Sequence, residues 1–146
     1  MHSQESLDTA TFGLPASLFL LALLVVLLAS SQASAQLDGD GDLVPDSFDN
    51  CLEIANGPNE PSNQVDTDLD GYGNPCDGDY DNSLIVDASD YATGFFPTLA
   101  GPGTLTDHDG NGIVTVTDFS LFLRQFSSGV PGPSGLACAG TIPCLP

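Results

Sequence analysis

The sequence predicts a small, mostly irregular fold with short α-helices, in which something other than a large hydrophobic core holds the chain together. The chain has 146 residues, enough for one or two small domains. It carries 20 acidic residues against a single basic residue, Arg124, and its formal net charge is −19. Hydrophobic residues make up 41% of the chain, and many of them lie near the N-terminus. The remainder of the chain is rich in Gly and Pro. Such a chain buries too little apolar surface for a large core.

The N-terminal segment, residues 1–35, has the pattern of a secretory signal peptide. An unbroken apolar run from Leu18 to Ala29 precedes Ala33-Ser34-Ala35, a cleavage motif before Gln36. The run is shorter than the roughly 20 residues that span a bilayer, which favours cleavage over the alternative of a retained anchor helix. We therefore expect a secreted, extracellular or cell-surface protein with no membrane association after cleavage. The near absence of Lys and Arg also argues against nucleic acid as a partner.

Four cysteines follow this segment, at Cys51, Cys76, Cys138 and Cys144. An even number of cysteines in an exported protein favours disulfides over metal thiolates. Three pairings are open. Because short loops lose less entropy on closure, we expect Cys51 to pair with Cys76 and Cys138 with Cys144.

Four twelve-residue windows between residues 38 and 118 repeat one spacing of oxygen-bearing side chains. Loop 1 spans residues 38–49, loop 2 residues 66–77, loop 3 residues 79–90 and loop 4 residues 107–118. Each loop places such side chains at positions 1, 3, 5, 9 and 12, with a backbone carbonyl at position 7, as calcium loops do. The candidate ligands are Asp38, Asp40, Asp42, Asp46 and Asp49; Asp66, Asp68, Asp70, Asn74 and Asp77; Asp79, Asp81, Ser83, Asp87 and Asp90; and Asp107, Asp109, Asn111, Thr115 and Asp118.

Chance does not account for this repeat. The 81 residues from 38 to 118 include 16 Asp and 7 Asn, so a random order gives roughly half a match to positions 1, 3, 5 and 12. Three loops match, and loop 3 departs only through Ser83 at position 5. Hard oxygen ligands favour Ca²⁺ over transition metals. The alternative is a solvated acidic linker.

Position 6 of the loops is the point where the backbone turns sharply. Gly71 and Gly112 occupy it in loops 2 and 4, and glycine tolerates the turn because it has no Cβ. Leu43 and Leu84 occupy it in loops 1 and 3. We therefore expect strained turns, and weaker or reshaped sites, in these two loops.

Residues 38–77 resemble thrombospondin type 3 repeats. The resemblance rests on DGDGDLVPDSFDNC at 38–51 and SNQVDTDLDGYGNPCD at 62–77. It implies a segment, residues 36–78, that wraps around calcium ions with little secondary structure and is stapled by cysteines. It also implies that the candidate ligands of loops 1 and 2 bind the ions.

Residues 79–126 resemble a type I dockerin, an EF-hand-like pair of calcium loops that are each followed by a helix. DHDGNGIVTVTDFSLFLRQF at 107–126 matches best, and DYDNSLIVDASDYATGFF at 79–96 is degraded. Thr115 and Asp118 form a capping box that predicts a helix start. The apolar side chains of this helix recur on one face, at Phe119, Phe122, Leu123 and Phe126. The resemblance implies a dockerin-like domain over residues 79–130.

The first unit of this pair has a weaker helix pattern. Tyr91 and Phe95 keep the apolar face, whereas Gly94 weakens the helix and Pro97 is expected to stop it. We expect the aromatic residues of the two units to pack against one another. Val86 and Val114 stand at position 8 of loops 3 and 4, where paired calcium loops usually form a short β-bridge.

The dockerin resemblance also implies a partner surface. In dockerins, loop positions 10 and 11 help to select the cohesin partner, and here these positions hold Ala88-Ser89 and Val116-Thr117. The Pro/Gly-rich tail, residues 131–146, is expected to be irregular and closed by Cys138–Cys144, and it has no readable function.

Together these features predict a secreted, calcium-binding, non-catalytic module for protein–protein docking or adhesion, whose partner is a cohesin-like receptor or a surface protein. The alternatives are a calcium-stiffened spacer or surface-matrix protein without a specific partner, and a calcium sensor. Catalysis lacks support. The one histidine beyond the N-terminal segment, His108, is expected to point into solvent from position 2 of loop 4, and calcium would neutralise paired carboxylates.

Overall fold

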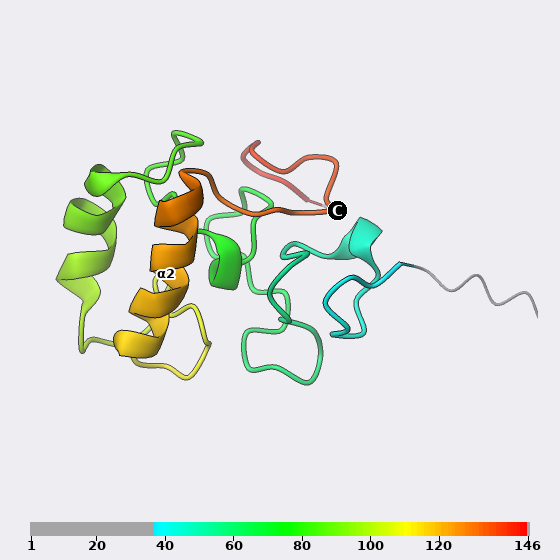
Figure 1. The fold of residues 1–146 in the computed structure, drawn as a ribbon, viewed down its shortest axis with the longest axis horizontal. Coiled ribbons are helices and arrows are strands. Elements are labelled where there is room, and N and C mark those ends of the chain that lie inside the picture. Colours follow the sequence, from blue (N-terminus) through cyan, green and yellow to red (C-terminus); the bar gives the residue numbers. More distant parts are fainter. Residues whose placement is uncertain (1–36, 146) are drawn as a thin grey trace, which may run out of the picture. The chain divides into compact units, whose positions relative to one another are not determined.

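The computed structural model describes residues 37–145, so the predicted signal peptide and its cleavage site lie outside the described residues. Residues Gln36–Pro146 form one compact unit, which contains the four loops and the tail (Figure 1). No described helix is long and apolar enough to cross a membrane.

The described residues contain few helices and no strand, which confirms the prediction of a mostly irregular fold. The helical elements are η1 (Asp46–Phe48), η2 (Asn74–Cys76), the π-helix η3 (Asp90–Phe95), η4 (Phe96–Thr98) and α2 (Val116–Ser128). One isolated antiparallel bridge joins Pro102 to Ile113. Ala88 and Ser89 are also helical and lead into η3, and the remainder of the described chain consists of turns and loops.

Helix α2 begins where the capping box predicts. The Thr115 side chain accepts a hydrogen bond from the backbone, and the Asp118 side chain accepts one from the Thr115 amide, which satisfies amides that the first helical turn leaves unpaired. The helix ends at Gly129, whose left-handed conformation (φ 75°) lets its amide reach the Gln125 carbonyl.

The helical segment after loop 3 differs from expectation in two respects. Gly94 was expected only to weaken the helix, but packing requires a glycine there, because a Cβ on residue 94 would lie 2.2 Å from the Tyr80 ring. Pro97 does not stop the helical course, since its ring fits the first turn of η4, which continues through Thr98.

The small core lies between η3 and α2, which run side by side in Figure 1. Its buried members are Val86, Phe95, Val114 and Phe122, with Tyr80, Tyr91 and Phe119 packed against them. The rings of Phe95 and Phe122 are 5.3 Å apart between centroids. The predicted helix packing is therefore present, although Leu123 and Phe126 from the same stripe remain 43% and 42% exposed.

The expected bridge between Val86 and Val114 does not form. The Val114 backbone instead pairs with Ala100 and Gly101, and the Val86 amide donates to the Gly129 carbonyl. The two valines meet only through the core, because the residues between loops 3 and 4 supply the backbone partners of loop 4.

The tail is irregular, as predicted, and it lies against loops 1 and 2. Its amides donate to carbonyls of the earlier chain, from Gly132 to Cys76, from Gly135 to Asp49, from Gly140 to Asp70 and from Cys144 to Leu69. A surface hollow is lined by Ser47 and Phe48 on one side and by Leu136, Ala137, Cys138 and Leu145 on the other. Next to it, the Asp46 amide donates to the Leu37 carbonyl.

Candidate metal centres

Each loop gathers three aspartates whose carboxylates each place one oxygen within 4.8 Å of the others. The four groups are Asp38, Asp40 and Asp42; Asp66, Asp68 and Asp70; Asp79, Asp81 and Asp90; and Asp107, Asp109 and Asp118. Loops 1 and 2 thus use positions 1, 3 and 5, whereas loops 3 and 4 use positions 1, 3 and 12. Position 5 is Asp only in loops 1 and 2 and is Ser83 or Asn111 in loops 3 and 4, so the sequence accounts for this part of the difference.

All four loops share one backbone conformation. Positions 4 and 6 have positive φ in every loop, at Gly41 and Leu43, Leu69 and Gly71, Asn82 and Leu84, and Gly110 and Gly112. The position 6 amide donates to the position 1 carboxylate in each loop, from Leu43 to Asp38, Gly71 to Asp66, Leu84 to Asp79 and Gly112 to Asp107. Leu43 (φ 79°) and Leu84 (φ 65°) therefore adopt the left-handed turn that the sequence predicts to be strained.

The partners of the position 12 carboxylate also differ between the two classes. In loops 3 and 4, Asp90 and Asp118 turn back into the loop and accept hydrogen bonds from the amides at positions 3 and 9. In loop 1, Asp49 instead accepts from Cys51 and Gln64. In loop 2, Asp77 accepts from the Asp79 amide, the first residue of loop 3. Its second oxygen is buried and has no hydrogen-bond partner.

The side chains predicted at position 9 serve the backbone and are not members of the acidic groups. Asp46 and Asn74 accept from the amides at position 2 of their loops, Gly39 and Thr67. At position 9 of loops 3 and 4, Asp87 accepts from the Ser89 amide and Thr115 caps α2. The position 5 side chains Ser83 and Asn111 also bond within their loops.

Several carboxylate oxygens are buried without a hydrogen-bond partner. They are Asp40 Oδ2, Asp68 Oδ1, Asp70 Oδ2 and Asp77 Oδ2. Asp70 and Asp77 are both 0% exposed. A buried ionised carboxylate without a partner is strongly unfavourable, so these oxygens fit the coordination shell of a cation.

The electrostatics of the loops lead to the same conclusion. Burial, followed by the charges of Asp68, Asp66 and Asp79, raises the pKa of Asp70 to about 7. Burial also raises the pKa of Asp77 well above its ordinary value, with Asp70 adding to the effect. Desolvation raises the pKa of Asp40, Asp49, Asp66 and Asp79 as well. A hard divalent cation such as Ca²⁺ would relieve this repulsion and matches the all-oxygen donor set.

The expectation for His108 is wrong, because its side chain is 0% exposed. The Tyr80 hydroxyl lies 2.7 Å from its Nε2, and its Nδ1 lies against the Asn74 carbonyl. Burial lowers the pKa of His108 to about 4, so at neutral pH the ring is uncharged, with Nδ1–H donating to Asn74 and Nε2 accepting from Tyr80. The imidazole thus joins loops 2, 3 and 4. Tyr80 and His108 both stand at position 2, and this shared position was the signal available in the sequence.

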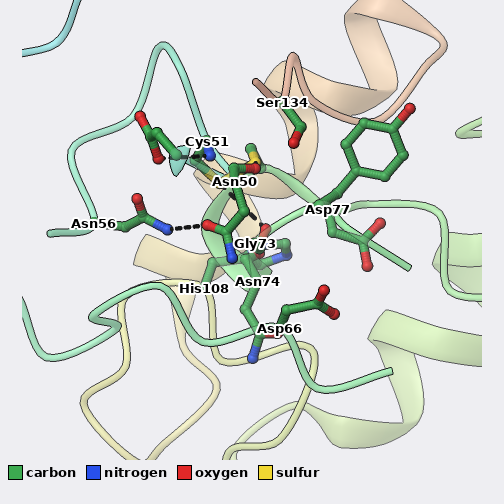
Figure 2. Close-up of a disulfide and its surroundings, with 12 residues drawn as sticks. Asn50, Cys51, Asn56, Asp66, Gly73, Asn74, Asp77, His108 and Ser134 are labelled. Carbon is green, nitrogen blue, oxygen red and sulfur yellow. Dashed lines mark hydrogen bonds between the residues drawn. A yellow bond between two sulfur atoms is a disulfide. The ribbon is translucent and has the colours of Figure 1, made fainter. Parts of the chain in front are cut away.

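Both predicted disulfides are present, Cys51–Cys76 and Cys138–Cys144. The first lies in a buried polar network that sequence reasoning missed (Figure 2). Asn56 donates to the Asn50 side chain at 2.7 Å, and the Asn50 carbonyl accepts from the Gly73 amide at 3.0 Å. Gln64 completes the network through the amide of Asn50 and the carboxylate of Asp49. Loops 1 and 2 are therefore cross-linked by more than the covalent bond.

The residues predicted to select a partner lie at the surface. Ala88, Ser89, Val116 and Thr117 are all exposed, and Val116 is 82% exposed. Ala88 also lines an apolar groove between η3 and α2, together with Tyr91, Phe119, Phe122, Leu123 and Phe126. This groove holds the part of the aromatic stripe that the core leaves uncovered.

Comparison with known families supports part of this picture. Residues 36–58 and 65–91 match the family model of the thrombospondin type 3 repeat. Thrombospondin type 3 repeats are extracellular calcium-binding modules. The match covers loops 1, 2 and 3, so it extends beyond the resemblance at 38–77, and it does not include loop 4. The chain matches no curated protein and no solved structure.

Proposed function

We propose that this chain is a secreted, non-catalytic calcium-binding module whose ions hold the loops and whose paired helices dock a partner protein. The observation that carries calcium binding is the set of buried carboxylate oxygens without partners, of which Asp70 and Asp77 supply two. The residues after position 35 include 18 acids and one base. Four calcium ions would offset about half of their net charge, which would otherwise expand the chain.

Export is supported by the two disulfides, which persist in oxidising compartments, and by the match to an extracellular repeat. The signal peptide at residues 1–35 and its cleavage before Gln36 belong to this proposal.

Docking through a dockerin-like pair, residues 79–126, is the finer part of the proposal. Loops 3 and 4 share one ligand class, with positions 1, 3 and 12, and each precedes a helical segment. The side chains at positions 10 and 11 are exposed, and one of them, Ala88, lines the apolar groove. We infer that this surface binds a cohesin-like receptor or another extracellular surface protein.

A module without catalysis also agrees with the burial of His108, which has no solvent-exposed ring nitrogen to act as a base.

Two experiments test this function separately. Native mass spectrometry of the secreted chain at graded calcium counts the ions, and a chain that binds none would refute calcium binding. Binding to a purified cohesin panel is then measured for wild type and for Val116→Arg, with Leu145→Arg as the control because Leu145 is also exposed, at 68%. We expect Val116→Arg alone to abolish binding. If no cohesin binds in calcium and the chain captures no protein from an extracellular extract in calcium, the spacer without a specific partner replaces the docking module.

A further inference from the structure

The tail makes a specific contact with the turn of loop 2. The Gly140 amide donates to the Asp70 carbonyl at 2.8 Å, and the Cys144 amide donates to the Leu69 carbonyl at 2.7 Å. Leu69 and Asp70 are positions 4 and 5 of the loop. In the described chain, no outside donor reaches the corresponding carbonyls of loops 1, 3 and 4. In the described chain, loop 2 is therefore distinguished by outside hydrogen bonds to these two carbonyls, whereas the turn of loop 4 is contacted from outside by packing alone, since a Cβ on Gly110 would lie 2.7 Å from the Ser62 nitrogen.

Packing at position 6 shows how closely the tail is seated. A Cβ on Gly71 would lie 2.6 Å from Cys144 Sγ and 2.8 Å from Ala139 Cα. Gly112 has the same place in loop 4 and almost the same backbone, with φ 94° against 92°, yet a Cβ on it would meet nothing within 4 Å. The turn of loop 2 thus lies directly against the disulfide loop of the tail.

The tail also packs against Tyr72, which stands at position 7 of loop 2. A Cβ on Gly132 would lie 2.8 Å from the Tyr72 ring, and one on Gly140 would lie 3.7 Å from the Tyr72 hydroxyl. Position 7 provides the backbone carbonyl in a calcium loop. The tail therefore contacts positions 4, 5 and 6 of loop 2, and also Tyr72 at position 7.

Loop 2 is also the loop with the largest number of unpartnered carboxylate oxygens. Three of the four buried oxygens without a partner belong to it, on Asp68, Asp70 and Asp77. Mutual repulsion of these groups would open the turn in the absence of an external restraint. We propose that residues 138–144, closed by the Cys138–Cys144 disulfide, hold the turn of loop 2 in its ion-binding form and raise the calcium affinity of this loop alone.

This inference rests on the calcium binding proposed above, and the first test separates the two. Calcium binding by the full secreted chain and by Cys138→Ser/Cys144→Ser is followed by native mass spectrometry at graded calcium. We expect one ion to bind about tenfold more weakly in the variant, because freeing the tail loosens two hydrogen bonds of ordinary strength. The remaining ions should bind as before. Thr93→Ala serves as the control, since its exposed hydroxyl bonds to the Ser89 carbonyl, outside the tail and loop 2.

The affected ion is identified with Asp70→Asn. Adding the serine pair to Asp70→Asn should weaken no further ion, because both changes act on loop 2. If the wild type binds calcium and the serine variant holds every ion with unchanged affinity, the tail has no such role. If the wild type binds no calcium, it is the proposed function that fails.

A second test does not require the disulfide to be removed. Gly71→Ala and Gly112→Ala introduce the same side chain at the same loop position with matched φ, so their backbone penalties are alike. Only Gly71→Ala meets the tail. We expect Gly71→Ala to reduce calcium affinity more than Gly112→Ala does, and the difference to shrink in the serine background. Equal losses in the intact protein would overturn the inference.

Discussion

Removal of calcium should unfold this protein, and the spacing of the carboxylates sets the size of the effect. In each group, three oxygens from different aspartates lie within 4.8 Å of one another. At an effective dielectric constant of about 20, two unit charges at that distance repel by about 3.5 kcal/mol, so three ionised carboxylates carry about 10 kcal/mol per group. A whole domain is stable by only about 5–15 kcal/mol. Repulsion of this size in four groups is comparable with the stability of a whole domain, so removal of the ions should unfold the chain.

The assay is circular dichroism with and without a chelator, because α2 (Val116–Ser128) gives the main helical signal. At pH 8 and low salt we expect chelation to remove most of this signal and calcium to restore it. A chelated protein that retains its full helical signal and a cooperative melt at pH 8 would refute the reasoning.

The pH dependence of the ion-free form provides an internal check. A carboxyl group whose folded pKa is raised stabilises the fold at low pH, and this contribution is lost as the pH rises through the folded pKa, which is about 7 for Asp70. The ion-free protein should therefore regain helical signal as the pH falls below 7 toward the ordinary carboxyl pKa of about 4. This recovery should be smaller in Asp70→Asn, which has no proton to gain at that position.

Three further predictions concern single side chains. Asp118→Ala should raise the calcium concentration needed for folding and lower the helicity at saturating calcium. It removes both a loop 4 carboxylate and the acceptor of the Thr115 amide, which lies 2.7 Å away. Asp118→Asn should keep the helicity, and equal losses of helicity in both variants would argue against the cap. Gly94→Ala should destabilise the calcium-loaded protein by about 1–3 kcal/mol in urea unfolding, because the new carbon would lie 2.2 Å from the Tyr80 ring, whereas Thr93→Ala on the exposed side should have little effect. Tyr80→Phe should lower the free energy of unfolding by about 1–3 kcal/mol, since it leaves Nε2 of the buried His108 without its hydrogen-bond donor. An unchanged melting temperature would show that the Tyr80–His108 hydrogen bond is dispensable.

The features that the sequence predicts correctly are those encoded over short distances along the chain. The capping box at Thr115–Asp118 fixes the start of α2 because its partners are three residues apart. The disulfides agree with the low entropy cost of closing short loops. The loop spacing brings together the position 1 and position 3 carboxylates in all four loops, because the shared turn at positions 4 and 6 is local.

The features that the sequence did not reveal depend on contacts between distant segments. Burial of His108 requires Asn74 from loop 2 and Tyr80 from loop 3, and neither lies near it in the chain. Gly94 was expected only to weaken a helix, because the Tyr80 ring that needs the space lies fourteen residues earlier. Whether the position 12 carboxylate joins the group depends on the segment after each loop, which is a helix after loop 4 and the disulfide network after loop 1.

The surface hollow between Phe48 and the tail shows where the two ends of the described chain lie. Leu37, where the described chain begins, is hydrogen-bonded to the neighbour of Ser47, and Leu145, the last described residue, lines the same hollow as Ser47 and Phe48. The two ends therefore leave the folded unit close together. Because the two ends are adjacent, a unit attached through both of them would add little length to a chain of such units.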